Sequence, residues 1–363
     1  MTMILFYFLF FYNNFIEIKI DSENTVWYHY FSCPSKVKGV KIMLSCRKKS
    51  PIIVAIGVLF LLVCSVFAGC AVRNTNSVTD KIKVIASLFP QYDFAKQIAG
   101  DKAEVSLLLP PGSESHTYDP SPADILKISN SDIFLYTGKD MEPWADKIIS
   151  SVKNRKLLIN DVSAGVELIK LEHDQEHHRH QDEHEHEHNF DPHIWLDLIL
   201  ASKMVDNIVL SFCEKDPENS EYYKNNAELL KQNLKKLDED FKDMINSAKR
   251  KSIVFAGRFA HLYFIKRYGL DYISAFDSCS TEAEPNIKKV SEILNFIRQN
   301  DIPAIYYEET SEPKFANSIA EQTGAKPLKF STLHNVTKAQ LENGVTFIDL
   351  MRENLDNLRR GLN

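Results

Sequence analysis

The chain has 363 residues, with 43 basic and 49 acidic side chains and a formal net charge of −6. Because the acidic excess is mild and no basic stripe runs through the sequence, no nucleic-acid partner is expected. About 280 residues follow Lys81, which is enough for two domains.

The N-terminus contains two unlike segments. Residues 1–42 are aromatic and have no clear period, so we interpret them as an over-extended gene start. Residues 43–69 have the order of a secretory signal peptide, with basic residues, an apolar stretch and small residues in turn. Cys70 then resembles the lipid-modified cysteine of bacterial lipoproteins. A plain transmembrane anchor over residues 51–70 is the alternative. Either interpretation places the remaining chain outside the cytoplasm, tethered to the outer face of the cell membrane.

Few cysteines remain in the part that is expected to fold. Cys33, Cys46 and Cys64 lie in or before the segment to be removed, and Cys70 would carry the lipid at the start of a tether, residues 70–80. Cys213 and Cys279 are left. They could pair in an oxidising compartment, but their positions in the sequence do not decide it.

Short apolar runs alternate with helical patterns over residues 81–215. The expected strands are Val84–Leu88, Val105–Leu109, Ile133–Tyr136 and Leu157–Ile159, and the helical patterns include Tyr92–Ile98 and Ala123–Ile128. Ser121 and Asp124 form a capping box before the second helix. This alternation predicts a mostly parallel sheet with helices on both faces, and hence an N-terminal α/β lobe.

A histidine-rich loop, residues 172–190, lies within this lobe. Its histidines alternate with acidic residues, a composition typical of metal capture: His173, His177, His178, His180, His184, His186 and His188. Because a segment this polar cannot form a core, we expect an auxiliary loop that collects ions without forming a selective site. The alternative is a solvated polar loop with no metal role.

The most regular helical pattern occupies residues 216–247. Asp216 and Pro217 form a start signal. Apolar residues then recur in alternating steps of four and three, which places them on one helix face: Tyr223, Ala227, Leu230, Leu234, Leu237, Phe241 and Met244. The spacing also suits a coiled-coil dimer. Because the heptads are few and their flanks lack clean charge pairing, a rigid intramolecular linking helix in a monomer is favoured.

Residues 248–363 repeat the alternation of the first lobe. The expected strands are Ser252–Phe255, Tyr272–Ala275, Ala304–Tyr307 and Pro327–Phe330, and the expected helices include Val290–Arg298 and Ala316–Gln322. The predicted fold is therefore α/β, with two lobes, each built on a central, mostly parallel sheet, joined by one long rigid helix.

Outside the histidine-rich loop, four histidines remain in the expected mature chain, and each lies near the edge of a predicted element. They are His116, His193, His261 and His334. In open α/β folds ligands bind beyond the carboxyl ends of the strands, where such edge positions gather. Two histidines come from each lobe, which favours one shared ion site over four unrelated surface residues.

Four stretches of residues 82–361 resemble the metal-binding lipoproteins of zinc and manganese ABC importers, the cluster 9 or A-I substrate-binding proteins. They read VIASLFPQYDFAKQIAGDKAEVSLLLPPGSESHTYDPSPADI, DPHIWLD, FIKRYGLDYISAFDSCSTEAEPN and AIYYEETSEPKFANSIAEQTGAK. The resemblance implies two α/β lobes joined by a rigid helix. It also implies that His116 and His193 are metal ligands, and that a His-rich loop precedes the second of them.

The second lobe departs from the family pattern. Arg258 stands where most members have a histidine, and no aspartate is present near Ser331, where many have one. His261 and His334 each stand three residues further on. We therefore predict His116, His193 and His334 as ligands and His261 as a weaker fourth.

Three positions of the second lobe each have an alternative interpretation. His261 could pack at the lobe interface beside Tyr263. Glu284 is a possible carboxylate ligand or supporting residue, or else a loop carboxylate without metal contact. Arg258 could pair with a nearby acid.

A site of three or four imidazoles favours Zn²⁺, because Mn²⁺ prefers more oxygen ligands. The expected function is capture of zinc in the cleft between the lobes and delivery to an ABC importer permease, without any reaction. The alternatives are a manganese-binding member of the family, a surface adhesin on this fold, or a zinc scavenger. A zinc hydrolase is disfavoured because the sequence contains no HExxH motif.

Overall fold

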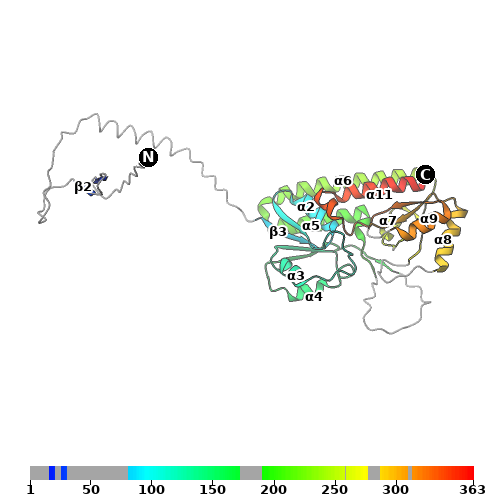
Figure 1. The fold of residues 1–363 in the computed structure, drawn as a ribbon, viewed down its shortest axis with the longest axis horizontal. Helices are drawn as coiled ribbons and strands as arrows, with labels where there is room; N and C mark the ends of the chain where they lie inside the picture. The colour runs from blue at the N-terminus through cyan, green and yellow to red at the C-terminus, as the bar shows by residue number, and fades with distance from the viewer. Residues whose placement is uncertain are drawn as a thin grey trace, which may run out of the picture. The chain divides into compact units, whose positions relative to one another are not determined.

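The computed structural model divides the chain into two compact units, residues 1–76 and residues 77–363 (Figure 1). It describes residues 16–20, 26–30, 81–171, 190–257, 259–276, 287–309 and 313–363. In the first unit, β1 (Ile16–Ile20) and β2 (Val26–Tyr30) pair antiparallel, a hairpin that the sequence pattern did not predict. The predicted signal peptide, Cys70 and the tether lie outside the described residues.

In the second unit, the first lobe is built on a four-stranded parallel sheet with the order β4-β3-β5-β6. Its strands are β3 (Ile82–Ala86), β4 (Ala103–Leu107), β5 (Ile133–Tyr136) and β6 (Leu158–Asp161). All four were predicted from apolar runs, with boundaries within three residues. β-Branched and aromatic side chains on the central strands are buried, as expected for a parallel sheet covered on both faces.

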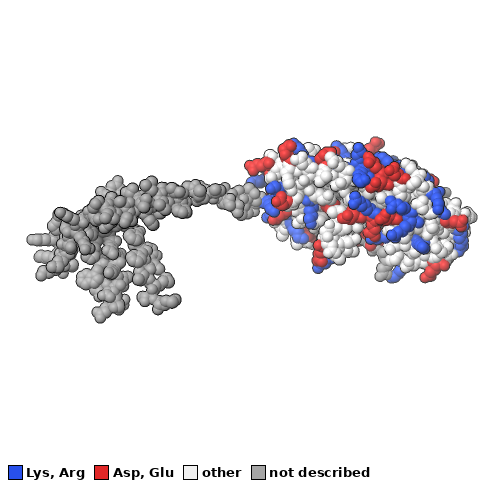
Figure 2. Space-filling view, turned by 90° about the horizontal axis from the view of Figure 1, so that it is seen from above, with Lys and Arg blue, Asp and Glu red and all other residues white. Residues whose placement is uncertain are grey.

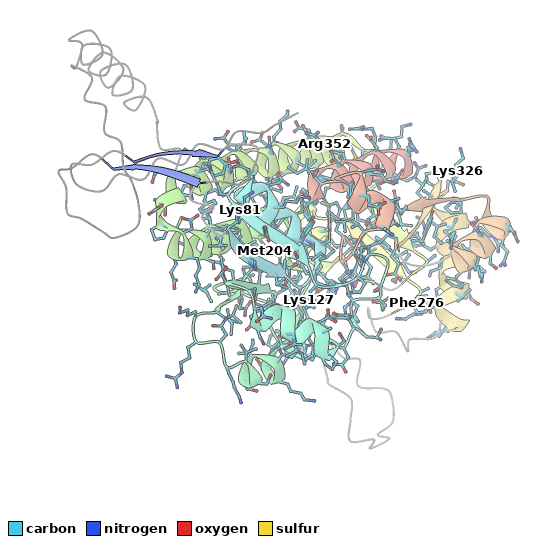
Figure 3. The ribbon with its side chains drawn as sticks, turned by 60° about the vertical axis from the view of Figure 1, so that its left-hand side comes forward. Lys81, Lys127, Met204, Phe276, Lys326 and Arg352 are labelled. Carbon is cyan, nitrogen blue, oxygen red and sulfur yellow. The ribbon has the colours of Figure 1, made fainter. Side chains whose placement is uncertain are left out.

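The helices of this lobe are α2 (Phe89–Ala99), α3 (Pro122–Ser129), α4 (Ala145–Ser151) and α5 (Leu198–Lys215). The predicted capping box is present, because Ser121 and Asp124 exchange hydrogen bonds at the start of α3. Met204, labelled in Figure 3, lies on α5 and is fully buried in the main core.

A short antiparallel pair, β7 (Ile169–Lys170) and β8 (Phe190–Asp191), flanks the histidine-rich loop. A 3-10 turn, η1 (Ile194–Leu196), follows it. His193 therefore precedes a 3-10 turn, not an α-helix. The reason is that Asp197 accepts hydrogen bonds from Ile199 N and Leu200 N, so α5 begins only at Leu198.

The long helix α6 (Ser220–Ser247) follows a 3-10 turn, η2 (Pro217–Asn219). The predicted start at residue 216 was thus a few residues early, because the Asp216 side chain accepts from Asn219 and Tyr223 and does not cap the helix. At 1.5 Å per residue the helix is about 42 Å long. All seven residues of the predicted face are buried within the chain itself, which accounts for the heptad spacing without a partner helix.

The second lobe repeats the strand order of the first, as β10-β9-β11-β12, again all parallel. Its strands are β9 (Ser252–Phe255), β10 (Asp271–Ser274), β11 (Ala304–Tyr307) and β12 (Lys326–Lys329). Its helices are α7 (Leu262–Tyr268), α8 (Ile287–Gln299), α9 (Lys314–Thr323), α10 (Lys338–Glu342) and α11 (Phe347–Leu362).

The last helix returns to the first lobe. In Figure 1, α11 runs along α6, and it also packs against α2. The backbone N–H of Phe347 donates to the buried carboxylate of Asp93 on α2, 2.9 Å away. Burial raises the pKa of Asp93 to about 6. Two helices, α6 and α11, therefore span both lobes, and the predicted fold of two parallel-sheet lobes with a long helix is confirmed.

The surface carries both signs of charge. On the face shown in Figure 2, blue Lys and Arg side chains are interspersed with red Asp and Glu side chains and form no single-sign field. Within the described part of the chain, no helix has the length and apolarity that crossing a bilayer requires.

Candidate metal centre

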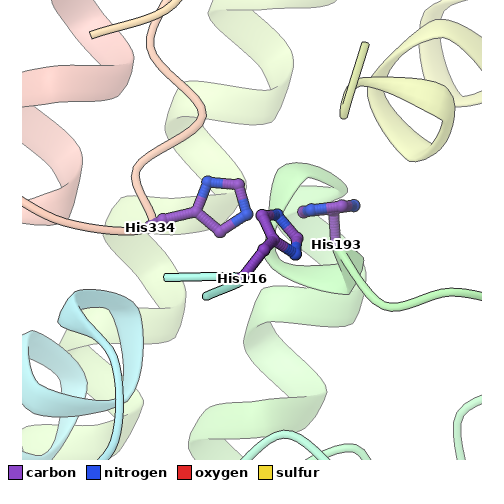
Figure 4. Close-up of side chains that lie close together, drawn as sticks. All are labelled: His116, His193 and His334. Atoms are coloured by element: carbon purple, nitrogen blue, oxygen red, sulfur yellow. The ribbon is translucent and has the colours of Figure 1, made fainter. Parts of the chain in front are cut away.

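Three of the predicted histidines meet at the junction of the two lobes. Figure 4 shows the rings of His116, His193 and His334 turned toward one another, from three different segments. Each ring offers one nitrogen, and these nitrogens lie within 4.8 Å of each other. The ring centroids are 5.5 Å apart for His116 and His193, 4.9 Å for His116 and His334, and 4.7 Å for His193 and His334.

His116 lies in the loop between β4 and α3, and the second lobe holds this loop. The buried side chain of Asn335 donates to the carbonyl oxygens of Pro110, at 2.7 Å, and Ser113, at 2.9 Å. Gly112 N donates to Val336 O. The residues beside His334 therefore fix the path of the loop that carries His116.

His193 is held by a carboxylate two residues before it. Asp191 Oδ1 accepts from His193 N at 2.9 Å and lies 2.6 Å from His193 Nδ1, and both residues are buried. A carboxylate only accepts hydrogen bonds, so the proton of a neutral ring is on Nδ1 and the lone pair is on Nε2. Tyr263 of the second lobe donates to Asp191 O, which fixes the turn that carries both residues.

His334 follows β12 in a tight turn. Leu333 adopts a φ of +60°, in the left-handed region that non-glycine residues rarely occupy, and its side chain is fully buried. This strained residue places Thr332 and His334 side by side, with Thr332 Oγ1 2.5 Å from His334 Nδ1. Backbone strain of this kind persists where the surrounding structure enforces it, and it concentrates at binding sites.

A buried indole closes one side of the three-histidine group. The Trp195 ring lies edge-on to His193 and to His334, with centroids 5.4 and 5.3 Å away. Its Nε1 donates to Thr332 O at 2.8 Å, which links the first lobe to the second. Exclusion of water from this side strengthens electrostatic interactions within the group.

The donor set is suited to a transition metal. Three imidazole nitrogens suit Zn²⁺, which binds nitrogen at roughly 2.0–2.1 Å and often keeps a fourth position open in sites with three protein ligands. His193 is 1% exposed and His334 is 7% exposed, so an ion held between them would be largely removed from solvent. Among the described residues, this group of potential ligands is the one that converges tightly enough to hold an ion.

His261 lies outside this group. It immediately precedes α7 and is fully buried, stacked on Phe255 at 4.8 Å and packed against Phe330 at 4.9 Å. Burial lowers the pKa of His261 to about 3, so its ring is neutral. Aromatic packing accounts for this position, although the main contacts are not to Tyr263 as the sequence alternative suggested.

The remaining predicted positions have simpler outcomes. Ser331 is buried, where its backbone exchanges hydrogen bonds with the side chain of Asn354. Within the described residues Cys213 forms no disulfide, and its pairing with Cys279 stays a prediction. Arg258, Glu284, Cys279 and the seven histidines of the histidine-rich loop lie outside the described residues.

Several residues that support the site were missed from sequence. Asp191 and Trp195 flank His193 in the DPHIW segment, so their proximity in sequence was an available signal. The sequence contained no such signal for Glu309, Thr332 and Asn335. Their hydrogen-bond partners are distant in the chain or depend on the turn at Leu333.

Comparison with known proteins identifies the family of the chain. The sequence pattern of the ZnuA family, described as "Zinc-uptake complex component A periplasmic", matches residues 84–361. The chain is 33% identical over 303 residues to the high-affinity zinc uptake system protein ZnuA of Bacillus subtilis (strain 168), covering 84% of this chain and 94% of that protein.

A second relative, from a streptococcus, is a longer protein, and the structure of one of its domains has been solved. The zinc-binding lipoprotein AdcA of Streptococcus pneumoniae is 30% identical over 314 residues, 86% of this chain, but the match spans only 61% of AdcA. The crystal structure of its Zn(II)-bound ZnuA-like domain superposes with a TM-score of 0.65 at 29% identity, covering 78% of this chain and 99% of that domain. From the extent of the family match, the chain belongs to the ZnuA family of periplasmic zinc-uptake components.

Proposed function

We propose that this protein captures Zn²⁺ between its two lobes and delivers it to the permease of an ABC importer. The observation that carries the proposal is the convergence of three histidine nitrogens within 4.8 Å of one another, drawn from both lobes of a ZnuA-family chain. Zinc is the cargo, and no chemical reaction is part of the function.

The ligands in this proposal are His116, His193 and His334. His193 and His334 would bind through Nε2, because their Nδ1 atoms contact Asp191 and Thr332. A site dominated by nitrogen favours zinc over manganese, which prefers oxygen ligands. The fourth position would be taken by water or by a residue outside the described part of the chain, with Glu284 as the predicted carboxylate. The proposal leaves out His261, the weaker prediction for a fourth ligand, because its ring packs against Phe255 and Phe330.

Zinc release in this mechanism depends on the separation of the lobes. Two ligands lie on the first lobe and His334 lies on the second, so relative movement of the lobes would remove one ligand of three. Acidification would also weaken binding, because a protonated imidazole cannot bind a cation.

Tethering to the membrane is part of the proposal. The signal peptide over residues 43–69 and the cysteine at position 70 support export followed by lipid attachment. A lipid on Cys70 would keep the binding protein beside its permease at the outer face of the membrane. Mass spectrometry of the membrane-extracted protein tests this, because a diacylated N-terminal Cys70 is expected.

Isothermal titration calorimetry tests the zinc site. Wild-type protein is expected to bind one zinc ion tightly, and His116→Ala or His193→Ala is expected to abolish that step. Deletion of residues 173–188 is the matched control, because the proposal assigns the histidine-rich loop only an auxiliary role. If the deletion removes all tight zinc binding, the three-histidine site is wrong.

Manganese binding and surface adhesion are the alternatives from the family resemblance. Competition between Zn²⁺ and Mn²⁺ in the same titration distinguishes the first. A strain that lacks the protein tests surface adhesion. Normal zinc uptake together with reduced attachment of the cells would favour adhesion over transport.

A further inference from the structure

We propose that Thr332 and Glu309 form a positioning relay that fixes the tautomer and orientation of His334, so that its Nε2 faces the ion. Neither residue would touch the ion. The inference rests on the proposed zinc site, but it makes a separate claim about the metal-free protein.

Every polar atom of Thr332 has a defined contact. Its backbone N–H donates to Glu309 Oε2 at 2.7 Å, and its hydroxyl lies 2.7 Å from Glu309 Oε1 and 2.5 Å from His334 Nδ1. Its carbonyl oxygen accepts from Trp195 Nε1 at 2.8 Å. Thr332 is 2% exposed, so these contacts are shielded from water.

The direction of the hydrogen bonds follows from the number of protons. The Thr332 hydroxyl has one proton, and the Glu309 carboxylate can only accept, so that proton points to Glu309. The hydroxyl oxygen then accepts a proton from His334 Nδ1. Because a neutral imidazole carries one N–H, the lone pair of His334 is on Nε2, the nitrogen required by the proposed site.

The fold explains why these three residues meet. Strands β11 and β12 are parallel neighbours, and their last register pair joins Tyr307 to Lys329. Glu309 lies two residues past the end of β11 and Thr332 three residues past the end of β12, at the same edge of the sheet. The left-handed Leu333 then turns His334 back beside Thr332.

The relay is the counterpart of Asp191 beside His193. There a carboxylate contacts Nδ1 directly, at 2.6 Å, and here a hydroxyl stands between the carboxylate and the ring. Outer partners of metal-binding histidines fix ring orientation and raise ligand basicity, and their loss typically costs about 10–100-fold in metal affinity. We therefore assign Thr332 and Glu309 a role in zinc affinity.

Nitrogen NMR of the metal-free protein, labelled on histidine, tests the relay without zinc. The wild-type His334 ring is expected as the Nδ1–H tautomer, assigned by comparison with His334→Ala. Thr332→Val keeps the shape of the side chain but removes the hydroxyl, so a substantial Nε2–H population is expected. Thr332→Ser retains the hydroxyl and should retain the Nδ1–H form. Glu309→Gln should shift the tautomer in the direction of Thr332→Val.

Zinc calorimetry on the same variants gives the functional readout. Thr332→Val is expected to weaken zinc binding about 10–100-fold, with rescue by Thr332→Ser. A wild-type His334 in the Nε2–H form, or an unchanged tautomer and affinity in Thr332→Val, would overturn the relay. If the wild-type protein does not bind zinc tightly, the proposed function is overturned instead. The tautomer measurement on the metal-free protein would still decide the relay.

Discussion

The two lobes have the same strand order but use the carboxyl edges of their sheets differently. In the first lobe, Ser87 follows β3 and Thr137 follows β5, and both donate to the buried carboxyl group of Glu142. In the second lobe, Glu309 follows β11 and holds Thr332, which contacts His334. The carboxyl group of Glu142 is thus enclosed in an internal polar cluster, whereas the carboxylate of Glu309 supports a candidate ligand.

The difference shows how one topology can serve two purposes. Parallel strands deliver polar side chains to the same edge in both lobes, and the loops decide whether those side chains contact each other or a ligand. Each lobe also holds a ligand segment of the other, because Asn335 holds the His116 loop, Tyr263 holds Asp191, and Trp195 holds Thr332. Zinc capture and lobe association are therefore expected to be coupled.

The largest expected effect belongs to His334, and His261 in the same lobe serves as its control. His334→Ala should abolish tight zinc binding, because it removes one of three converging nitrogens. His261→Phe should leave zinc affinity nearly unchanged, because it keeps an aromatic ring against Phe255 and Phe330. Calorimetry of both variants measures this. The reverse pattern would assign the second-lobe ligand to His261.

An intermediate effect is expected for the contact between the lobes at Asn335. Asn335→Ala leaves the carbonyl oxygens of Pro110 and Ser113 without their donor, at a cost of about 1–3 kcal/mol in the free energy of unfolding. Zinc affinity should fall as well, because the His116 loop must then be ordered on binding. Thermal unfolding and calorimetry measure the two effects, and Asn317→Ala, at an exposed position of α9, is the control. Lower stability with unchanged affinity would show that other contacts position His116.

The smallest effect concerns the internal polar cluster around Glu142 in the first lobe. Burial raises the pKa of Glu142 to about 8 from an ordinary value of 4.5. Between these pH values the folded chain keeps a proton that the unfolded chain releases, so the stability from this group is present below pH 4.5 and is lost as the pH rises toward 8.

Glu142→Gln mimics the protonated acid and should remove this pH dependence. As the pH rises from 5 to 8, the melting temperature of the wild type should therefore fall relative to that of the variant. The difference is about 2–4 °C for each kcal/mol of unfolding free energy that the wild type loses. Thermal scans without zinc at several pH values measure it. Parallel pH profiles for the two proteins would mean that Glu142 is ionised in the folded state.

Much of the fold was predictable because its signals are local. Apolar runs identified all eight strands of the two lobe sheets, and the capping box at Ser121 marked the start of α3. The spacing from Tyr223 to Met244 identified the buried face of α6. The helix start was misplaced because Asp216 and Pro217 form a turn signal that the chain uses for a 3-10 turn.

The candidate site was predictable only in part. The family resemblance pointed to His116 and His193, and position at a strand edge pointed to His334. Position alone gave equal reason to choose His261, which the structure surrounds with Phe255 and Phe330. The difference depends on side-chain surroundings, which a linear pattern does not contain.

The sequence by itself determined which residues form strands and helices, because hydrophobic period and capping act over a few neighbouring residues. Only the tertiary structure decided that His116, His193 and His334 meet, and that Glu309 reaches His334 through Thr332. Those contacts join segments up to about 220 residues apart. They depend on the parallel register of β11 with β12 and on the left-handed turn at Leu333, which bring together residues that are distant in the sequence.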